Sequence, residues 1–419
     1  MAAAFGEVSE MSPTLRGLEP PHLLHLTTSL DMGGSQTMLA KLVELSAGGA
    51  RQPRHAAISL MRPGAIAGRL QSSGCPVYDL GMTRGIPSLV ASVRMLRIIS
   101  AVRPDLLQGW MYHGNLAASV AELATGTPVV WNVRHSLNAP QCEKKSTRLL
   151  LRLSSRLAHR TRAIIYNSHV AANEHEAIGF PADRTIVIPN GFDCTRFHPT
   201  RSRRVDVRAL FSIPEGPMLL CMAARLHPMK DHARLVEAVG RARSAGHDFH
   251  LLLVGPGLET PPRALSQAIA RTLPPDRVTL VGERSDLDEW LAGVDVLALP
   301  SAWGESFPNI LGEAMACGVA CVATRVGDCQ HILGQSGLVV GPSDTEQLAG
   351  ALVRLASLGA QDRRRLGDIG RARVVEHFSL ESVGHRYRRL YERLLNDDAN
   401  IFTRLPTARP EVAAGAGPS

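Results

Sequence analysis

Aromatic residues are scarce in this chain, at 4% of 419 residues. They are not interleaved with basic residues, so we expect no stacking platform for single-stranded nucleic acid. Runs of about 18 to 20 apolar residues, the length that crosses a bilayer, are also absent. Residues 1–19 lack a basic stretch followed by an apolar one, which predicts a flexible leader rather than a secretory signal.

The cysteines show no pairing pattern. All seven are scattered without CxxC spacing, mostly among apolar residues, which predicts reduced thiols in the cytoplasm. Cys317, Cys321 and Cys329 lie closer together, but their spacing matches no common zinc motif. We therefore expect these three side chains to pack in a core.

The formal net charge of +8 indicates an anionic partner. A phosphorylated substrate, an anionic membrane surface and nucleic acid all suit a basic protein. Because the aromatic pattern does not suit nucleic acid, we predict no nucleic-acid partner.

The first half of the chain alternates strand-like apolar runs with helical patterns, which is typical of a parallel sheet with helices on both faces. This predicts a doubly wound, Rossmann-like domain over residues 20–190. Its strands are expected at 22–28, 55–60, 105–109, 128–133 and 163–167, and its helices at 35–45 and 88–102.

The pattern restarts after Pro189-Asn190-Gly191, a turn signal with a glycine that is able to take a positive φ. A second open sheet is predicted over residues 191–378. A helix at 379–395 is expected to pack back towards the first domain, and residues 396–419 to be disordered. Strands of the second sheet are expected at 218–223, 249–255, 278–281, 294–299, 320–324 and 337–340, and helices at 231–245 and from about 308.

Two glutamates eight residues apart form the strongest motif, in the segment 304–314. Pro308 is expected to be the first residue of a helix, so Glu305 precedes this helix and Glu313 lies in its second turn. The free amides at the helix start would suit a diphosphate. Carboxylates repel phosphate, so we expect the glutamates to accept hydrogen bonds from sugar and ribose hydroxyls. The alternative is that both are ordinary surface acids.

A second motif, Arg225 and Lys230, follows the first predicted strand of the second domain. At the carboxyl edge of a sheet, the planar guanidinium of Arg225 would bind phosphate oxygens and Lys230 would add a mobile charge. Isolated basic residues are more often surface charges, and the nearby glutamate motif is what favours the site.

Three weaker patterns remain. Gly33-Gly34 follows the first strand and allows close backbone approach to a ligand, although the full GxGxxG spacing is missing. His113 and His135 each follow a strand of the first domain. Asp286-Leu287-Asp288 resembles an acidic metal motif, but its position before a helix favours capping, so no metal is predicted there.

Together these motifs resemble family 4 glycosyltransferases, which are retaining enzymes of the α/β class with the two-domain GT-B fold. The resemblance covers residues 20–395 and rests on the EX7E motif Glu305 to Glu313, the Arg225/Lys230 loop, the segment 188–193 and the Gly33-Gly34 loop. It implies two doubly wound domains that face each other across a cleft. Segments 110–115 and 131–136 look most like bacterial members that build lipopolysaccharide or exopolysaccharide, generally from UDP-sugars.

The resemblance also implies roles. Glu305 would contact the donor sugar and Glu313 the ribose, while Arg225 and Lys230 would neutralise the leaving diphosphate. His135 looks like the family histidine beside the anomeric centre, with His113 left as an alternative. The other implied donor contacts are Gly33, Gly34, Phe307, Asn309 and Ile310, and the acceptor-side candidates are His113 and Asn115. No metal ion or other cofactor is implied, because cations and helix amides stabilise the leaving group.

The basic segment 143–162 suggests a membrane contact. Arg148, Arg152, Arg156 and Arg160 recur every four residues, which on a helix gathers them in one stripe beside several leucines. Either this helix buries its leucines and solvates its arginines, or it faces anionic lipid and brings the site to a lipid-linked acceptor.

Two other functions remain open from the sequence. A GT-B sugar-nucleotide epimerase would share the fold and the nucleotide site. A basic binding protein with a degenerate sugar-nucleotide fold would not need the intact set of Arg225, Lys230, Glu305 and Glu313.

Overall fold

The computed structural model describes residues 20–47, 52–83, 88–137, 145–200 and 205–396. The predicted leader 1–19, Cys142 and the predicted tail from residue 397 onward lie outside the described residues.

A parallel sheet forms from the first part of the chain, as predicted. Its strands, in spatial order, are β3 (Val77–Asp79), β2 (Arg54–Ser59), β1 (His22–Thr27), β4 (Leu106–Trp110), β5 (Val129–Val133), β6 (Ala163–Tyr166) and β7 (Thr185–Val187). The helices between these strands are α1 (Gly34–Ser46), α2 (Ile66–Ser72), α3 (Leu89–Val102), α4 (Met111–Thr125), α5 (Lys145–Ala158) and α6 (His169–Ala177), with a 3-10 turn η2 (Ala182–Arg184).

The second part of the chain forms another parallel sheet. Its strands, in spatial order, are β10 (Val278–Val281), β9 (Phe249–Val254), β8 (Met218–Ala223), β11 (Val296–Leu299), β12 (Ala320–Thr324) and β13 (Gly337–Val340). Its helices are α7 (Val207–Leu210), α8 (His232–Ser244), α9 (Arg263–Thr272), α10 (Leu287–Trp290), α11 (Asn309–Ala316), α12 (Cys329–Leu333), α13 (Thr345–Ser357), α14 (Ala360–Phe378) and α15 (Leu380–Leu395). The 3-10 turns are η4 (Pro228–Lys230), η5 (Pro275–Arg277) and η6 (Leu291–Gly293).

In both sheets the strands follow one another outward from a central pair, first towards one edge and then towards the other. The central pair is β1 and β4 in the first sheet and β8 and β11 in the second. This doubly wound order confirms the predicted fold class. The order reverses at each central pair, and the loops leaving such a switch point are where open α/β sheets bind ligands.

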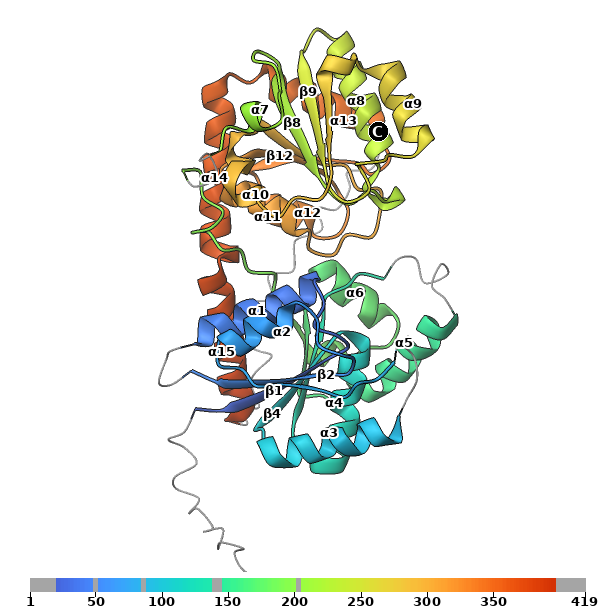
Figure 1. The fold of residues 1–419 in the computed structure, drawn as a ribbon, viewed down its shortest axis with the longest axis vertical. Helices are drawn as coiled ribbons and strands as arrows, with labels where there is room; N and C mark the ends of the chain where they lie inside the picture. Colours follow the sequence, from blue (N-terminus) through green and yellow to red (C-terminus); the bar gives the residue numbers. More distant parts are fainter. Residues whose placement is uncertain (1–19, 48–51, 84–87, 138–144, 201–204, 397–419) are drawn as a thin grey trace, which may run out of the picture. The chain divides into compact units, whose positions relative to one another are not determined.

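The two faces of the second sheet belong to separate hydrophobic clusters. Alternate residues of β8 take part in each: Cys221 packs with α10, α11, α12 and α14, and Met222 packs with α8, α9 and α13. Figure 1 shows these two groups of helices on opposite flanks of the sheet. Because the strands are buried on both faces, their sequences read as continuous apolar runs.

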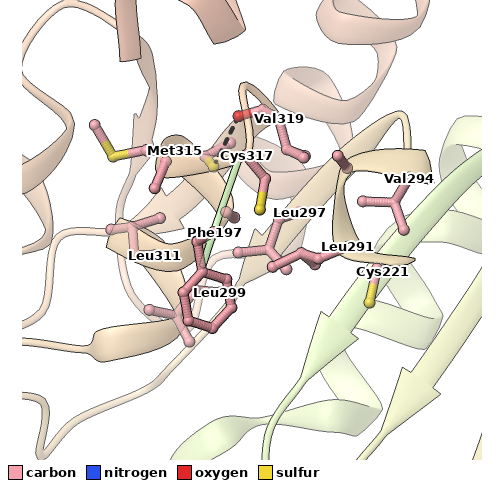
Figure 2. Close-up of a cluster of buried hydrophobic side chains, with 14 of the residues drawn as sticks. Phe197, Cys221, Leu291, Val294, Leu297, Leu299, Leu311, Met315, Cys317 and Val319 are labelled. Atoms are coloured by element: carbon pink, nitrogen blue, oxygen red, sulfur yellow. Dashed lines mark hydrogen bonds between the residues drawn. The ribbon is translucent and has the colours of Figure 1, made fainter. Parts of the chain in front are cut away.

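The cysteines of the second sheet lie in its core, as predicted. Figure 2 shows Cys221 and Cys317 among Leu291, Leu297 and other buried side chains. Cys317, Cys321 and Cys329 are each at most 2% exposed, and the six cysteines that the structure describes form no disulfide. Burial raises the pKa of the Cys221 thiol to about 12, so it stays protonated and unreactive.

Contacts divide the chain into two compact units. The smaller contains the described residues up to 132 together with 160–162, and the larger contains 133–159 and the described residues from 163 onward. Gly191, in the larger unit, does not use its freedom to take a positive φ. A glycine is needed there for space, since a Cβ would lie 2.8 Å from Leu380 Cδ2. No helix in the described ranges has both the length and the apolar character to cross a membrane.

Candidate functional site

Two loops of the larger unit meet where the order of the second sheet reverses. β8 and β11 are hydrogen-bonded neighbours, so the loops leaving their carboxyl ends, residues 224–231 and 300–308, emerge next to each other. The amide of Ala302 donates to the carbonyl oxygen of Met229 at 2.8 Å, which joins the two loops. Both predicted charge motifs begin on these loops.

Lys230 and Glu305 form a buried ion pair at this point. Lys230 Nζ donates to Glu305 Oε1, and the two side chains are 14% and 7% exposed. Ser301 Oγ donates to the same oxygen at 2.6 Å, and Thr324 Oγ1 donates to the carbonyl oxygen of Ser301 at 2.6 Å. The sequence placed Lys230 and Glu305 in one site without predicting this direct contact. It missed Ser301, whose only signal is a hydroxyl two residues after a strand end.

Two glycines let neighbouring loops approach the pair. Gly255, after β9, has a φ of 149°, and a Cβ there would lie 2.2 Å from the carbonyl oxygen of Ala224. Gly327 has a φ of 57°, and its Cβ would lie 2.4 Å from the carbonyl oxygen of Glu305. Any side chain at these positions would therefore displace the loops that carry Arg225 and Glu305.

Arg225 provides an available cation on the loop that carries Lys230. Its side chain is exposed and makes no hydrogen bond or ion pair with the described residues. The rest of its loop is fixed: His227 Nδ1 accepts from the amide of Met229 at 3.2 Å and caps the turn η4. Arg225 thus presents, on an ordered loop, a guanidinium that the described side chains leave without a partner, which suits anion binding.

Helix α11 begins one residue later than predicted. Pro308 is its N-cap, with φ −69° and ψ 117°, and Asn309 is the first helical residue. The φ of proline suits either position, but the extended ψ of Pro308 excludes it from the helix. The first amides of α11 still lack acceptors within the helix, as the diphosphate hypothesis requires.

Two residues predicted to line the donor pocket have structural partners. Asn309 Oδ1 accepts from Asn190 Nδ2 at 2.6 Å. Phe307 is 5% exposed and lies between two other rings, with centroid distances of 6.1 Å to Phe192 and 5.5 Å to Phe378. Phe307 therefore anchors the Glu305 loop in the core, and its burial does not support a ligand contact by the ring.

Glu313 is half-buried in the second turn of α11, as predicted, and lies within electrostatic range of Arg196. The pKa of Arg196 is raised mainly by its hydrogen bond to Asp288, with a smaller effect of Glu313. Ile310, on the same helix, is half-buried and packs against the hydrophobic cluster of that face.

The acidic segment before α10 is occupied by other contacts. Asp288 accepts from Arg196 at 2.8 Å. Asp286 pairs with Arg284 and accepts from the indole of Trp290 at 3.3 Å. Within the described ranges, no group of three or more His, Cys, Asp or Glu side chains is arranged to hold a metal ion.

The residue after His135 contacts the Glu305 loop within the larger unit. Ser136 is 2% exposed, and its Oγ donates to the carbonyl oxygen of Glu305 at 2.8 Å. His135 is the adjacent residue and is half-buried, so this bond places the backbone of His135 near the Glu305 loop. Nothing in the local sequence marks Ser136, since its partner lies 169 residues away.

The smaller unit carries the remaining predicted ligand contacts. Gly33 is the N-cap of α1, and Gly34 is exposed, with no atom within 4 Å of an added Cβ. His113 is exposed in the first turn of α4 rather than at a strand end. Asn115 is fully buried and its Oδ1 accepts from the amide of Asn132 at 3.3 Å, so its burial does not support the predicted contact with the acceptor.

The arginine stripe on α5 is shorter than predicted. Arg148, Arg152 and Arg156 occupy exposed positions of the helix. The helix ends at Ala158, so Arg160 lies beyond it, where it pairs with Glu122 at 3.0 Å.

The leucines of α5 are not all buried. Leu151, Ser154 and Ala158 form the buried side of the helix, whereas Leu149 is 59% and Leu153 46% exposed. The exposed side therefore combines arginines with leucines, which is not the pattern of a simply solvated face.

A cavity of about 230 Å³ lies elsewhere in the larger unit. Asp295, Ala320, Arg363 and Arg364 are among its lining residues. It adjoins the amino ends of β11 and β12, the end of the sheet opposite to the switch-point loops, and none of the predicted site residues lines it.

Comparisons with known proteins agree with this arrangement. The family model "Glycosyl transferases group 1" matches residues 217–357, and the model "Glycosyl transferase 4-like domain" matches residues 32–191. The Anabaena protein HepE, solved in complex with UDP, has the same fold, with a TM-score of 0.77 and 21% identity over 88% of this chain and 99% of HepE.

Two curated relatives carry more specific names. The N-acetyl-alpha-D-glucosaminyl L-malate synthase of Bacillus anthracis is 31% identical over 45% of this chain and 49% of its own length. The GDP-mannose-dependent alpha-(1-6)-phosphatidylinositol dimannoside mannosyltransferase of Mycobacterium tuberculosis is 27% identical over 81% of this chain and 86% of its own. The chain thus spans about half the length of the first of these relatives.

Proposed function

Since this chain belongs to the glycosyltransferase group 1 family and has its GT-B fold, we propose that it is a retaining, metal-independent sugar transferase that uses a nucleoside diphosphate donor. We propose a UDP-sugar as donor and a glycan or lipid-linked molecule of cell-surface polysaccharide or lipopolysaccharide synthesis as acceptor. The observation that carries this proposal is the buried Lys230–Glu305 pair together with Arg225, which lies on the same loop as Lys230 and has no partner among the described residues.

Each charged group at this site suits one part of a nucleotide sugar. Arg225 and the first amides of α11 suit the diphosphate, and Lys230 suits the oxygen that gains charge as the bond to the sugar breaks. Glu305 would accept from sugar hydroxyls and Glu313 from the ribose. His135 and the Gly33-Gly34 loop remain proposed sugar and diphosphate contacts.

This set of residues makes electrostatic catalysis the main contribution. As the diphosphate leaves, positioned cations stabilise its developing charge, while the sugar becomes oxocarbenium-like. The acceptor hydroxyl attacks the anomeric carbon on the face that the diphosphate leaves. Its proton passes to the departing phosphate oxygen, so no protein base is needed.

The direct test is transfer from a radiolabelled donor. The full chain is incubated with UDP-glucose or GDP-mannose and a membrane lipid extract, and labelled glycan or lipid is measured together with the nucleotide released. Labelled product with retained anomeric configuration supports the proposal. Conversion of the sugar nucleotide without any acceptor would favour an epimerase instead, and binding of neither UDP nor GDP would favour a non-catalytic binding protein.

The domain division is part of the same proposal. We propose an acceptor-side domain over residues 20–190 and a donor domain over 191–378, with α15 packing back towards the former. The support is that the strands of the first sheet end at residue 187 and those of the second begin at 218.

We further propose that α5 attaches the enzyme to the cytoplasmic face of the plasma membrane. Arg148, Arg152 and Arg156 supply positive charge on its exposed side, where Leu149 and Leu153 add apolar surface. Each basic residue near an anionic surface contributes about 1 kcal/mol, and partly inserted leucines add to this.

Sedimentation with vesicles tests the attachment. The native chain is expected to pellet with phosphatidylserine-containing vesicles at low salt and to be released at high salt, because the attraction is screened. Changing Arg148, Arg152 and Arg156 to Gln should abolish pelleting. Arg160→Gln is the matched control, because Arg160 lies outside the helix and is paired with Glu122. Equal pelleting of the triple variant would contradict the proposal.

A further inference from the structure

Trp303 differs from every other tryptophan of this chain. The sequence contains four tryptophans, and Trp110, Trp131 and Trp290 are at most 1% exposed. Each of those three indoles also donates a hydrogen bond, to His25, Ser119 and Asp286 respectively. Trp303 is 46% exposed, and its indole has no hydrogen-bond partner among the described residues. A large aromatic side chain in this state, in a chain so poor in aromatic residues, suggests a ligand contact.

The position of Trp303 connects it to the catalytic charges. The hydrogen bond from Ser301 Oγ to Glu305 Oε1 closes a short loop over residues 301–305, and Trp303 is the middle residue of that loop. Ala302 is fixed to Met229 by its amide, and Gly304 turns the chain with a φ of 77°. The indole is therefore carried at the tip of an ordered loop whose two ends hold the Glu305 carboxylate.

Exposure separates Trp303 from the donor contacts. Lys230 and Glu305 are 14% and 7% exposed, while Trp303, two residues from Glu305, is 46% exposed. The exposed fraction thus rises from the ion pair to the indole. A donor that places its reacting bond against the ion pair occupies the buried end of the loop. A molecule that reaches the same loop from solvent meets the indole, and in a transfer reaction that molecule is the acceptor.

The chemistry of the indole selects among acceptor classes. A pyranose ring has an apolar face of C–H groups and a rim of hydroxyls, which match the apolar face and the free N–H donor of an indole. A small anionic acceptor such as malate or an inositol phosphate needs a cation, and Trp303 offers none. We propose that Trp303 is a specificity-determining residue that stacks on a pyranose ring of the acceptor, so the acceptor is a glycan. This rests on the proposed transferase function.

Fluorescence and kinetics test the stacking together. Trp303 is the exposed tryptophan, so acrylamide quenches mainly its emission in the native chain. With UDP bound, we titrate the methyl pyranosides of glucose, galactose, mannose and N-acetylglucosamine up to about 100 mM, a range that covers weak binding. At least one pyranoside is expected to protect the emission, while malate and inositol 1-phosphate should not. The protecting pyranoside is then used as acceptor with UDP-glucose and GDP-mannose.

Variants distinguish stacking from a structural role. Trp303→Leu should raise the acceptor KM about 10-fold, in line with the loss of one aromatic contact, and leave the donor KM within about 2-fold. Trp303→Phe should recover most of the acceptor affinity. Ile369, on α14, is 55% exposed, which is similar to Trp303. Ile369→Ala removes this apolar side chain and should change neither the acceptor KM nor the donor KM.

The outcomes are separable from those of the proposed function. If the native chain binds UDP but no pyranoside protects Trp303, or if Trp303→Leu leaves the acceptor KM unchanged or raises both KM values equally, the stacking proposal is wrong and the transferase proposal stands. If the native chain binds neither UDP nor GDP, the transferase proposal itself is wrong.

Discussion

The Lys230–Glu305 pair makes a quantitative prediction about stability. Both side chains are largely buried, at 14% and 7% exposed, so removing one partner leaves the other charge in a poorly solvated place. Such a change typically costs about 3 to 5 kcal/mol. We expect Lys230→Met to lower the free energy of unfolding by an amount in that range. Among the described residues, the hydroxyl of Ser301 would then be the side chain that still donates to the Glu305 carboxylate. Glu305→Gln should cost less, about 2 kcal/mol, because Gln keeps an oxygen that accepts from Ser301.

The double variant separates pairing from packing. With both charges removed, no buried charge is left alone, so Lys230→Met/Glu305→Gln should cost less than the sum of the single changes. We expect a coupling free energy of about 2 to 3 kcal/mol, measured by urea unfolding followed by circular dichroism. The control cycle is Arg365→Met with Asp362→Asn, an exposed pair with side chains 69% and 58% exposed, whose coupling should be close to zero. Additive effects at Lys230 and Glu305 would refute the buried-pair argument.

The same variants separate stability from catalysis. Glu305→Gln should lower kcat for transfer at least about 100-fold, because a hydrogen bond that strengthens in the transition state is lost. Activity is measured below the urea midpoint, at a temperature where the variant is folded. Near-native turnover by folded Glu305→Gln would remove Glu305 from the reacting centre.

Further variants and conditions test the rest of the site. Arg225→Ala should weaken UDP binding at least about 10-fold in calorimetry, since it removes a charge-assisted phosphate contact; unchanged affinity would move the diphosphate elsewhere. Transfer should survive EDTA, because fixed cations replace the metal in stabilising the leaving group; loss of activity that Mg²⁺ restores would contradict this. Acid should destabilise the fold, because burial lowers the pKa of His55 and of His175 from 6.5 to about 4. The unfolded state then binds more protons below pH 6.5, so the stabilisation is complete above that pH and is lost as the pH falls towards 4. The urea midpoint should drop over this interval, and a flat profile would contradict the burial of these neutral histidines.

The strands were predictable because parallel strands buried on both faces read as apolar runs. β8, β10, β12 and β13 have the predicted bounds. The apolar pattern did not reveal β3 or β7, which have only three residues each, and it did not reveal α14. Burial along α14 involves Gly367, Gly370, Val374 and Phe378 amid charged residues, so its sequence shows little amphipathic pattern.

The ends of elements were less predictable than their cores. The stripe from Arg148 to Arg160 has a helical period throughout, yet α5 ends at Ala158 and Arg160 pairs with Glu122 of α4. At Pro308 the φ of proline fits both the N-cap and the first turn, so sequence alone does not decide between them. In both places a tertiary contact or one ψ angle determines the end.

Within the site, the predictable part was what the topology dictates. Loops after adjacent central strands must meet, which brings Lys230 near Glu305. The support from Ser301, Thr324 and Ser136 was not predictable, because each acts through a single hydroxyl whose partner is set by the packing of distant segments.

The ion pair also assigns an order to donor binding. Lys230 is already engaged by Glu305, so a diphosphate reaches it only by sharing it with that carboxylate. Arg225 is exposed and has no partner among the described residues, so its contact with phosphate costs no existing bond. We therefore expect Arg225 to supply the first charge contact and most of the ground-state affinity for the donor. The Lys230 contact should strengthen as the leaving oxygen gains charge. An interaction that is stronger in the transition state than in the bound substrate accelerates the reaction, whereas one of equal strength in both only binds the substrate.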